Sequence, residues 1–96
     1  MKIPVYNPLI ESDDILAVKD VLEERWLGQG KHVKEFENKI ANILENPERK
    51  VVAVSNGTVG IHLAFLIAGV GAGDEVIVTS LNFVGVCQAI LAVGAE

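Results

Sequence analysis

The sequence has 96 residues, 50% of them apolar, and a formal net charge of −5. A chain this short forms one small domain at most, and its acidic balance without a basic cluster argues against nucleic acid or an anionic membrane as the main partner. Its apolar runs are too short for a membrane span. The single cysteine, Cys87, excludes an internal disulfide and fits a cytoplasmic protein.

Charged residues are unevenly placed along the chain. All 8 lysines and arginines lie in residues 1–50, whereas residues 51–96 carry only Asp74, Glu75 and Glu96 as charged groups. The change in composition predicts two regions, 1–50 and 51–96. The second has the composition of the interior of a larger domain.

The first region predicts an extended arm and two helices. Residues 1–10 contain two prolines and favour an extended arm. Apolar residues at helical spacing then predict an amphipathic helix over 11–25, capped by Ser12 or Asp13. Two glycines in residues 26–30 indicate a loop, and a second amphipathic helix is predicted over 32–44. Residues 46–49 have the composition of a turn.

The second region alternates between strand and helix patterns. Its predicted strands are 51–54 and 75–79, and its predicted helices are 59–68 and 84–93, which end at Gly69 and Gly94. Residues 71–74 form a turn. This order predicts parallel strands of an α/β sheet, joined by a right-handed crossover. Because two strands cannot bury both faces of a sheet, we expect a third strand after residue 96, and therefore a fragment of a longer protein.

The segment Ser55-Asn56-Gly57-Thr58 stands between the first strand and the helix after it. Asn-Gly is a strong hairpin signal, but the residues that follow lack the alternation of a returning strand. At the end of a parallel strand, a helix start offers free N–H groups to a phosphate, and Gly57 and Thr58 suit that contact. The alternative is an ordinary helix cap, in which Ser55, Asn56 or Thr58 satisfies the first amides.

Phe83 follows the second predicted strand, at the same edge of the sheet. Its ring could stack on an aromatic cofactor next to the phosphate, or it could belong to the core. The spacing of His32, His62 and Cys87 matches no metal site, and a structural role is the simpler interpretation for each.

These features together resemble the N-terminal part of the DegT/DnrJ/EryC1/StrS family of pyridoxal-phosphate-dependent sugar aminotransferases. The resemblance covers almost the whole chain and depends on the order and spacing of its pieces, which are IPVYNPLI, RWLGQG, HVKEFE, VAVSNGTVGIHLAF and GAGDEVIVTSLNFVGVCQAILAVGAE. It implies an α/β fold, the N-terminal part of the large domain of an aspartate-aminotransferase-like (fold type I) transferase. Residues 51–96 would begin the cofactor-binding domain, and residues 1–50 would form the arm and two helices before it.

The resemblance also implies roles for individual residues. Gly57 and Thr58 match the family's phosphate-binding pair, Asn56 occupies a position usually held by a small polar residue, and Phe83 matches the aromatic residue that stacks on the pyridine ring. The loop formed by Trp26, Leu27, Gly28 and Gln29 matches one that lies near the active site in relatives, often across a dimer interface. Gly28 stands where relatives often have threonine.

No catalytic residue is expected in the chain itself. The family's cofactor-binding lysine is expected beyond Glu96, and residues 51–96 contain no lysine. The resemblance implies a cytoplasmic homodimer of polysaccharide biosynthesis that transfers an amino group, from glutamate, to a nucleotide-linked keto sugar. Two alternatives stay open. One is a sugar dehydratase of the same family; the other is a truncated, non-catalytic module that binds a partner.

Overall fold

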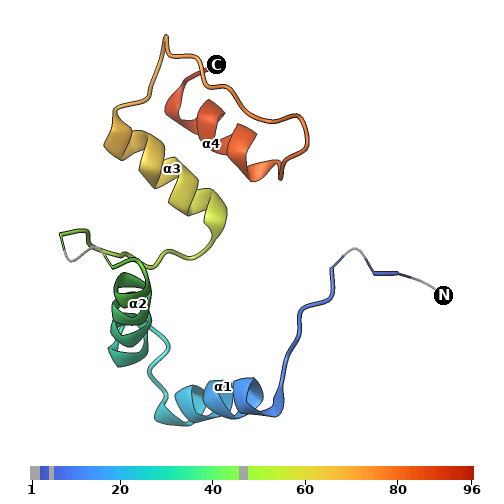
Figure 1. Ribbon diagram of the computed structural model, residues 1–96, viewed down its shortest axis with the longest axis vertical. Helices are drawn as coiled ribbons and strands as arrows, with labels where there is room; N and C mark the ends of the chain where they lie inside the picture. Colours follow the sequence, from blue (N-terminus) through green and yellow to red (C-terminus); the bar gives the residue numbers. More distant parts are fainter. Residues whose placement is uncertain (1–2, 5, 46–47) are drawn as a thin grey trace. The chain divides into compact units, whose positions relative to one another are not determined.

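The structure is a computed structural model that describes residues 3–4, 6–45 and 48–96. Its described residues form four helices, namely α1 (Ser12–Glu24), α2 (Lys31–Ile43), α3 (Gly57–Ala68) and α4 (Gly85–Val93), shown in Figure 1. The chain divides into two compact units, Met1–Arg49 and Lys50–Glu96. The predicted arm of residues 1–10 and the predicted turn of residues 46–49 lie partly outside the described residues.

Helix α1 begins at Ser12, before either of the helix starts that a cap at Ser12 or Asp13 would give. Glu11 is the N-cap residue, and its backbone amide donates to Oδ2 of Asp14 at 2.9 Å. A carboxylate three residues into a helix commonly accepts from the N-cap amide in this way. The prediction of Ser12 or Asp13 as the cap is therefore wrong. The helix ends at Glu24, and its C-cap residue, Arg25, has a left-handed φ of 59°.

Helix α2 confirms the second predicted helix, with bounds shifted by one residue. It follows Gly30, whose carbonyl accepts from the amide of Lys34 at 3.1 Å. Val33 and Ile40 of its apolar stripe are half-buried. On the opposite, charged side, Lys39 pairs with Glu35 one turn away at 2.9 Å.

Helices α3 and α4 of the second unit pack against each other (Figure 1). Both predicted helices are confirmed, and so are both glycine stops. Gly69 and Gly94 have φ values of 77° and 81°, the left-handed region that glycine enters without a Cβ clash. The small core of this unit comes from α4 and the residue after its stop, with Ala89, Ile90 and Ala95 buried.

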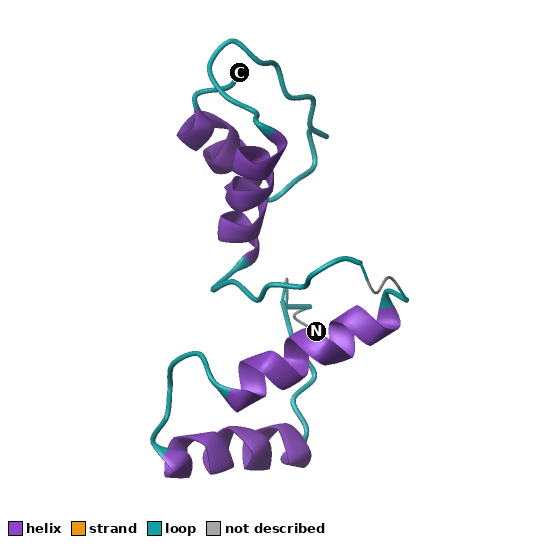
Figure 2. Cartoon of the chain, turned by 90° about the vertical axis from the view of Figure 1, so that its left-hand side faces the viewer, coloured by secondary structure: helices purple, strands orange, loops and turns teal. Residues whose placement is uncertain are grey.

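The two predicted strands are not formed. Residues 51–54 and 75–79 are described without strand structure, and Figure 2 shows them as loops. A strand exists only through lateral hydrogen bonds and covered faces, and the side chain of Ile77 is 99% exposed. Residues 51–54 and 75–79 have the composition of strands. The described part of the chain does not supply the neighbouring strands and covering layers that strands need.

A parallel pairing nevertheless begins at the end of α4. The amide of Glu96 donates to the carbonyl of Asp74 at 2.9 Å, and the amide of Val76 donates to the carbonyl of Glu96 at 2.7 Å. Glu96 thus bonds to Asp74 and to Val76, the two neighbours of Glu75, which lies opposite it. This is the hydrogen-bond pattern of parallel strands. Helix α4 therefore connects two segments that run in the same direction where they pair.

The glycine-rich turn before this pairing is closed by Asp74. Its Oδ2 accepts from the amide of Gly71 at 2.8 Å, and its own amide donates to the Gly71 carbonyl at 3.1 Å. Gly73 has a φ of 91° inside the turn. These contacts fix the start of the segment that pairs with Glu96.

No helix among the described residues is long and apolar enough to cross a membrane.

Candidate functional site

The corner at residues 55–58 is the start of α3. Asn56 is the N-cap residue, with an extended φ of −166°, and its Oδ1 accepts from the amide of Val59 at 3.0 Å. Its backbone carbonyl accepts from the amide of Gly60 at 3.1 Å. Asn56-Gly57 is therefore a helix start and not a hairpin turn, and the capping interpretation holds for Asn56.

The cap leaves two amides available to a ligand. The first N–H groups of a helix have no partner within it, and Asn56 satisfies only those of Val59 and Gly60. In the part of the chain that the structure describes, the amides of Gly57 and Thr58 have no acceptor. A Cβ built on Gly57 would meet nothing within 4 Å. Free amides, open space and the positive end of the dipole of a 12-residue helix fit a phosphate ester.

Thr58 and Phe83 come together at Gly85. A Cβ built on Gly85 would overlap the hydroxyl of Thr58 and would lie 3.0 and 3.1 Å from Cδ1 and Cε1 of the Phe83 ring. Gly85 itself is buried in the first turn of α4. The predicted phosphate contact and the predicted ring contact are thus neighbours, although 24 residues of sequence separate them. Gly85 carries no signal of this kind in the sequence, because only the packing of α3 on α4 brings it against Thr58.

Phe83 does not belong to the core of the described chain. It is 73% exposed, and its backbone amide donates to Oδ1 of Asn82 at 2.8 Å. An aromatic face left in the open next to free helix amides suits stacking on a flat ring. The structure therefore places Asn56, Gly57, Thr58 and Phe83 around one corner of the second unit.

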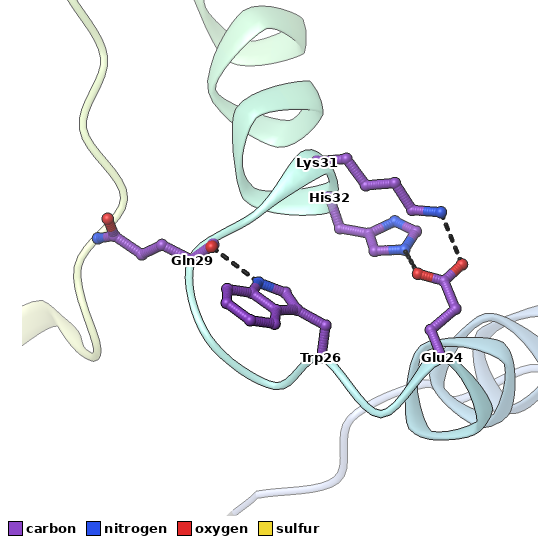
Figure 3. Close-up of polar contacts among 5 residues, drawn as sticks. All are labelled: Glu24, Trp26, Gln29, Lys31 and His32. Carbon is purple, nitrogen blue, oxygen red and sulfur yellow. Dashed lines mark hydrogen bonds and ion pairs between the residues drawn. The ribbon is translucent and has the colours of Figure 1, made fainter.

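The loop formed by Trp26, Leu27, Gly28 and Gln29 lies in the first unit (Figure 3). The indole Nε1 of Trp26 donates to the backbone carbonyl of Gln29 at 2.9 Å, which closes the loop. Leu27 is 72% exposed. With both helices, the loop borders a pocket of about 510 Å³ lined by Val21, Glu24, Trp26, Leu27, Gly28, Gly30, Lys31, His32 and Val33.

Glu24 links the two helices on either side of this loop. Its Oε1 accepts from Nζ of Lys31 at 2.7 Å, and its Oε2 lies 3.3 Å from Nε2 of His32, as Figure 3 shows. The hydrogen bond from Lys31, followed by that from His32, holds the pKa of the Glu24 carboxyl below its ordinary value. These charges join the end of α1 to the start of α2.

Among the described residues, no group of three or more His, Cys, Asp or Glu side chains could hold a metal ion. Cys87 is exposed, and His32 is engaged with Glu24. His62 lines a small pocket between α3 and α4, one turn along α3 from Thr58.

Comparison with known proteins decides the family. The model of the DegT/DnrJ/EryC1/StrS aminotransferase family matches residues 8–96. The chain belongs to this family. The match confirms the resemblance seen in the sequence, and it includes the start of α3 and Phe83 as well as the Trp26 loop.

Two curated relatives of the family are similar over almost the whole chain. GDP-perosamine synthase of Escherichia coli O157:H7 is 39% identical over 94 residues, which cover 97% of this chain and 25% of the relative. The UDP-4-amino-4-deoxy-L-arabinose--oxoglutarate aminotransferase of Shewanella sediminis (strain HAW-EB3) is 36% identical over 94 residues, which cover 98% of this chain and 24% of the relative. The chain thus spans about a quarter of the length of these family members.

A solved structure supports the fold. The chain superposes on the crystal structure of the aminotransferase TlmJ from Streptoalloteichus hindustanus with a TM-score of 0.79 and 37% sequence identity. The superposition covers 99% of this chain and 26% of TlmJ. The segments described here without strand structure therefore belong to an aminotransferase fold.

Proposed function

We propose that the protein is a pyridoxal-phosphate-dependent aminotransferase that acts on a nucleotide-linked keto sugar, with glutamate as amino donor. The observation that carries the proposal is the meeting of Thr58 and Phe83 at Gly85, next to the free amides of α3. Both curated relatives carry a nucleotide-linked sugar in their names, and one also names oxoglutarate, the keto acid that corresponds to glutamate.

In this proposal, the chain binds and orients the cofactor. The amides of Gly57 and Thr58 hold the phosphate at the positive end of α3, and the Thr58 hydroxyl adds a third donor. Asn56 keeps the helix start in place, and the ring of Phe83 lies against the pyridine. Pyridoxal phosphate, when bound, supplies the electron sink for amino transfer. Residues 51–96 contain no lysine, so covalent contact with the cofactor is assigned to none of them.

The proposal gives the two units different tasks. Residues 51–96 begin the cofactor-binding large domain, and residues 1–50 form the arm and two helices that precede it. The loop of Trp26, Leu27, Gly28 and Gln29 contacts the substrate or a second subunit of a homodimer. The exposure of Trp26 (65%) and Leu27 (72%) supports such a contact. A cytoplasmic location fits a chain with a single, exposed cysteine.

Cofactor titration tests the proposal in the complete protein. Binding of pyridoxal phosphate is followed by its visible absorbance, for the unmodified protein and for Thr58→Val. The substitution keeps the shape but removes one donor to a charged phosphate, an interaction worth about 1.5–3 kcal/mol. The affinity should fall about tenfold or more, at about 1.4 kcal/mol per tenfold. Thr79→Val is the matched control, because its hydroxyl donates to the Leu81 carbonyl at 3.3 Å and has no part in the proposed site.

Cofactor binding by Phe83→Ala provides a second, independent test. Loss of the ring contact, worth about 0.5–1.5 kcal/mol beyond area burial, should weaken cofactor retention. Neither substitution should appreciably lower the melting temperature of the cofactor-free protein. If the apo protein melts earlier and the affinity is unchanged, Thr58 and Phe83 are structural and the proposed site is wrong. A protein that binds pyridoxal phosphate but transfers no amino group from glutamate to a nucleotide-linked keto sugar would refute the proposed reaction.

A further inference from the structure

The backbone of Phe83 is held on both sides of its Cα atom. Its amide donates to Oδ1 of Asn82 at 2.8 Å, and its carbonyl accepts from the amide of Val86 at 3.2 Å. Each bond fixes one of the two rigid peptide planes that meet at this Cα atom, and only φ and ψ relate these planes. The two bonds together therefore set the direction in which the Phe83 side chain leaves the backbone.

The bond to Asn82 shapes the loop before α4 and does not cap the helix. The N-cap residue of α4 is Val84, which makes no side-chain cap bond in the described chain, and the amide of Phe83 precedes it. Asparagine commonly bonds to nearby backbone in turns. A second bond of this kind lies just before it, where Oγ1 of Thr79 donates to the Leu81 carbonyl at 3.3 Å. The side chain of Asn82 thus acts on the residue that carries the ring.

Gly85 limits the position of the ring on one side. A Cβ built there would lie 3.0 and 3.1 Å from Cδ1 and Cε1 of Phe83, and it would overlap the Thr58 hydroxyl. One edge of the ring therefore lies beside the proposed phosphate contact, over a residue without a side chain. The ring is still 73% exposed, and an exposed side chain readily changes rotamer. Its orientation therefore depends on how firmly the backbone of Phe83 is held.

We propose that Asn82 is a positioning residue of the cofactor site, which orients the ring of Phe83 for stacking before the cofactor binds. This inference rests on the proposed function, because it concerns the same ring contact. A side chain that is ordered in advance loses less freedom on binding, and such preorganisation raises affinity without a new contact. Because Asn82 acts only through Phe83, its effect is confined to ligands that have a ring.

The test compares two probes in the complete protein. Pyridoxal phosphate is titrated by its visible absorbance, and inorganic phosphate, which has the anion but no ring, is titrated by its competition with pyridoxal phosphate. Asn82→Ala should bind pyridoxal phosphate about twofold to tenfold more weakly, the range for ordering one side chain. It should bind inorganic phosphate as tightly as the unmodified protein. Thr79→Val loses a hydrogen bond of the same loop, to the Leu81 carbonyl, and should change neither affinity.

A double-variant cycle separates positioning from a general loss of structure. In a Phe83→Ala background, Asn82→Ala should cause no further loss of pyridoxal-phosphate affinity, because the ring that it positions is gone. Asn82→Asp retains the accepting oxygen and adds a charge that acts on both probes. The ratio of its two affinities should therefore return to that of the unmodified protein.

The results that contradict the positioning role differ from those that contradict the proposed function. Asn82 does not position the ring if Asn82→Ala weakens both probes equally, adds its effect to that of Phe83→Ala, or leaves the pyridoxal-phosphate affinity unchanged. An unmodified protein that fails to bind pyridoxal phosphate would instead overturn the proposed function.

Discussion

The Thr58 hydroxyl lies directly against the backbone of Gly85, where the first turns of α3 and α4 meet. A Cβ on Gly85 would overlap this hydroxyl and would crowd the ring of Phe83 at 3.0 and 3.1 Å. Gly85 is buried, although it stands in the first turn of its helix. Both proposed cofactor contacts therefore depend on a position that has no side chain.

Gly85→Val should damage both the packing of the second unit and the cofactor site. Overpacking of a tight contact costs about 1–3 kcal/mol, and Thr58 and Phe83 must both move to admit the branched side chain. We expect a lower apo melting temperature and weaker binding of pyridoxal phosphate. Gly85→Ala is the graded comparison, since one methyl group requires the Thr58 hydroxyl to rotate away and the Phe83 ring to shift only slightly. A valine variant with unchanged melting and affinity would show that the close approach does not matter.

The capping side chain of Asn56 gives a prediction for the stability of α3. Its Oδ1 caps α3 by accepting from the amide of Val59 at 3.0 Å, and loss of such a cap costs about 0.5–2 kcal/mol. Asn56→Ala should lower the apo melting temperature, whereas Asn56→Ser retains a capping oxygen and should melt close to the unmodified protein. Thermal unfolding followed by circular dichroism measures both. Equal melting of the alanine and serine variants would contradict the capping role.

The sequence predicts the helices well and the strands poorly, for a physical reason. Helix signals are local: the apolar spacing of α1 and α2, and the stops at Gly69 and Gly94, act within a few residues. Strand 75–79 needs a partner along its length. The described chain provides such a partner only at Glu96, which bonds on both sides of Glu75.

The site divides in the same way between local and tertiary features. Glycine and polar residues at the start of a helix are visible in the sequence, and so is the aromatic residue after the second predicted strand. The close approach of Gly85 to Thr58 is not, because it arises where α3 packs on α4.

Two glycines of the Trp26 loop provide a matched pair of tests. A Cβ on Gly30 would lie 2.8 Å from Nε1 and 2.9 Å from Cδ1 of Trp26, whereas a Cβ on Gly28 would come no closer than 4.0 Å to the indole. Gly30→Ala should therefore displace the ring and break its hydrogen bond to the Gln29 carbonyl. Because Trp26 is the only tryptophan of these 96 residues, the fluorescence of this chain reports the change directly. Gly28→Ala should leave the emission unchanged, and an identical shift in both variants would contradict the predicted contact.

The ion pairs of Glu24 predict how the stability of the first unit depends on pH. Its pKa is lowered in the folded chain, chiefly by the hydrogen bond from Lys31. A carboxyl with a depressed folded pKa stabilises the fold above its unfolded pKa, about 4.3 for glutamate. That contribution is lost as the pH falls below this value toward the lowered folded pKa. Because the Glu24 side chain is 39% exposed, solvent and salt keep the effect small.

Glu24→Gln isolates this contribution, because the amide keeps the shape of the side chain and removes its charge. Compared with the unmodified chain, the variant should lose less helical stability between pH 5 and pH 3, an interval of about two units around the ordinary glutamate pKa. It should also be slightly less stable at neutral pH and less sensitive to salt, since Lys31 has lost its partner. Urea unfolding followed by circular dichroism at several pH values measures these differences. Glu48→Gln removes an exposed carboxyl outside the helices and serves as the control. If the two variants show the same pH dependence, Glu24 does not couple α1 to α2.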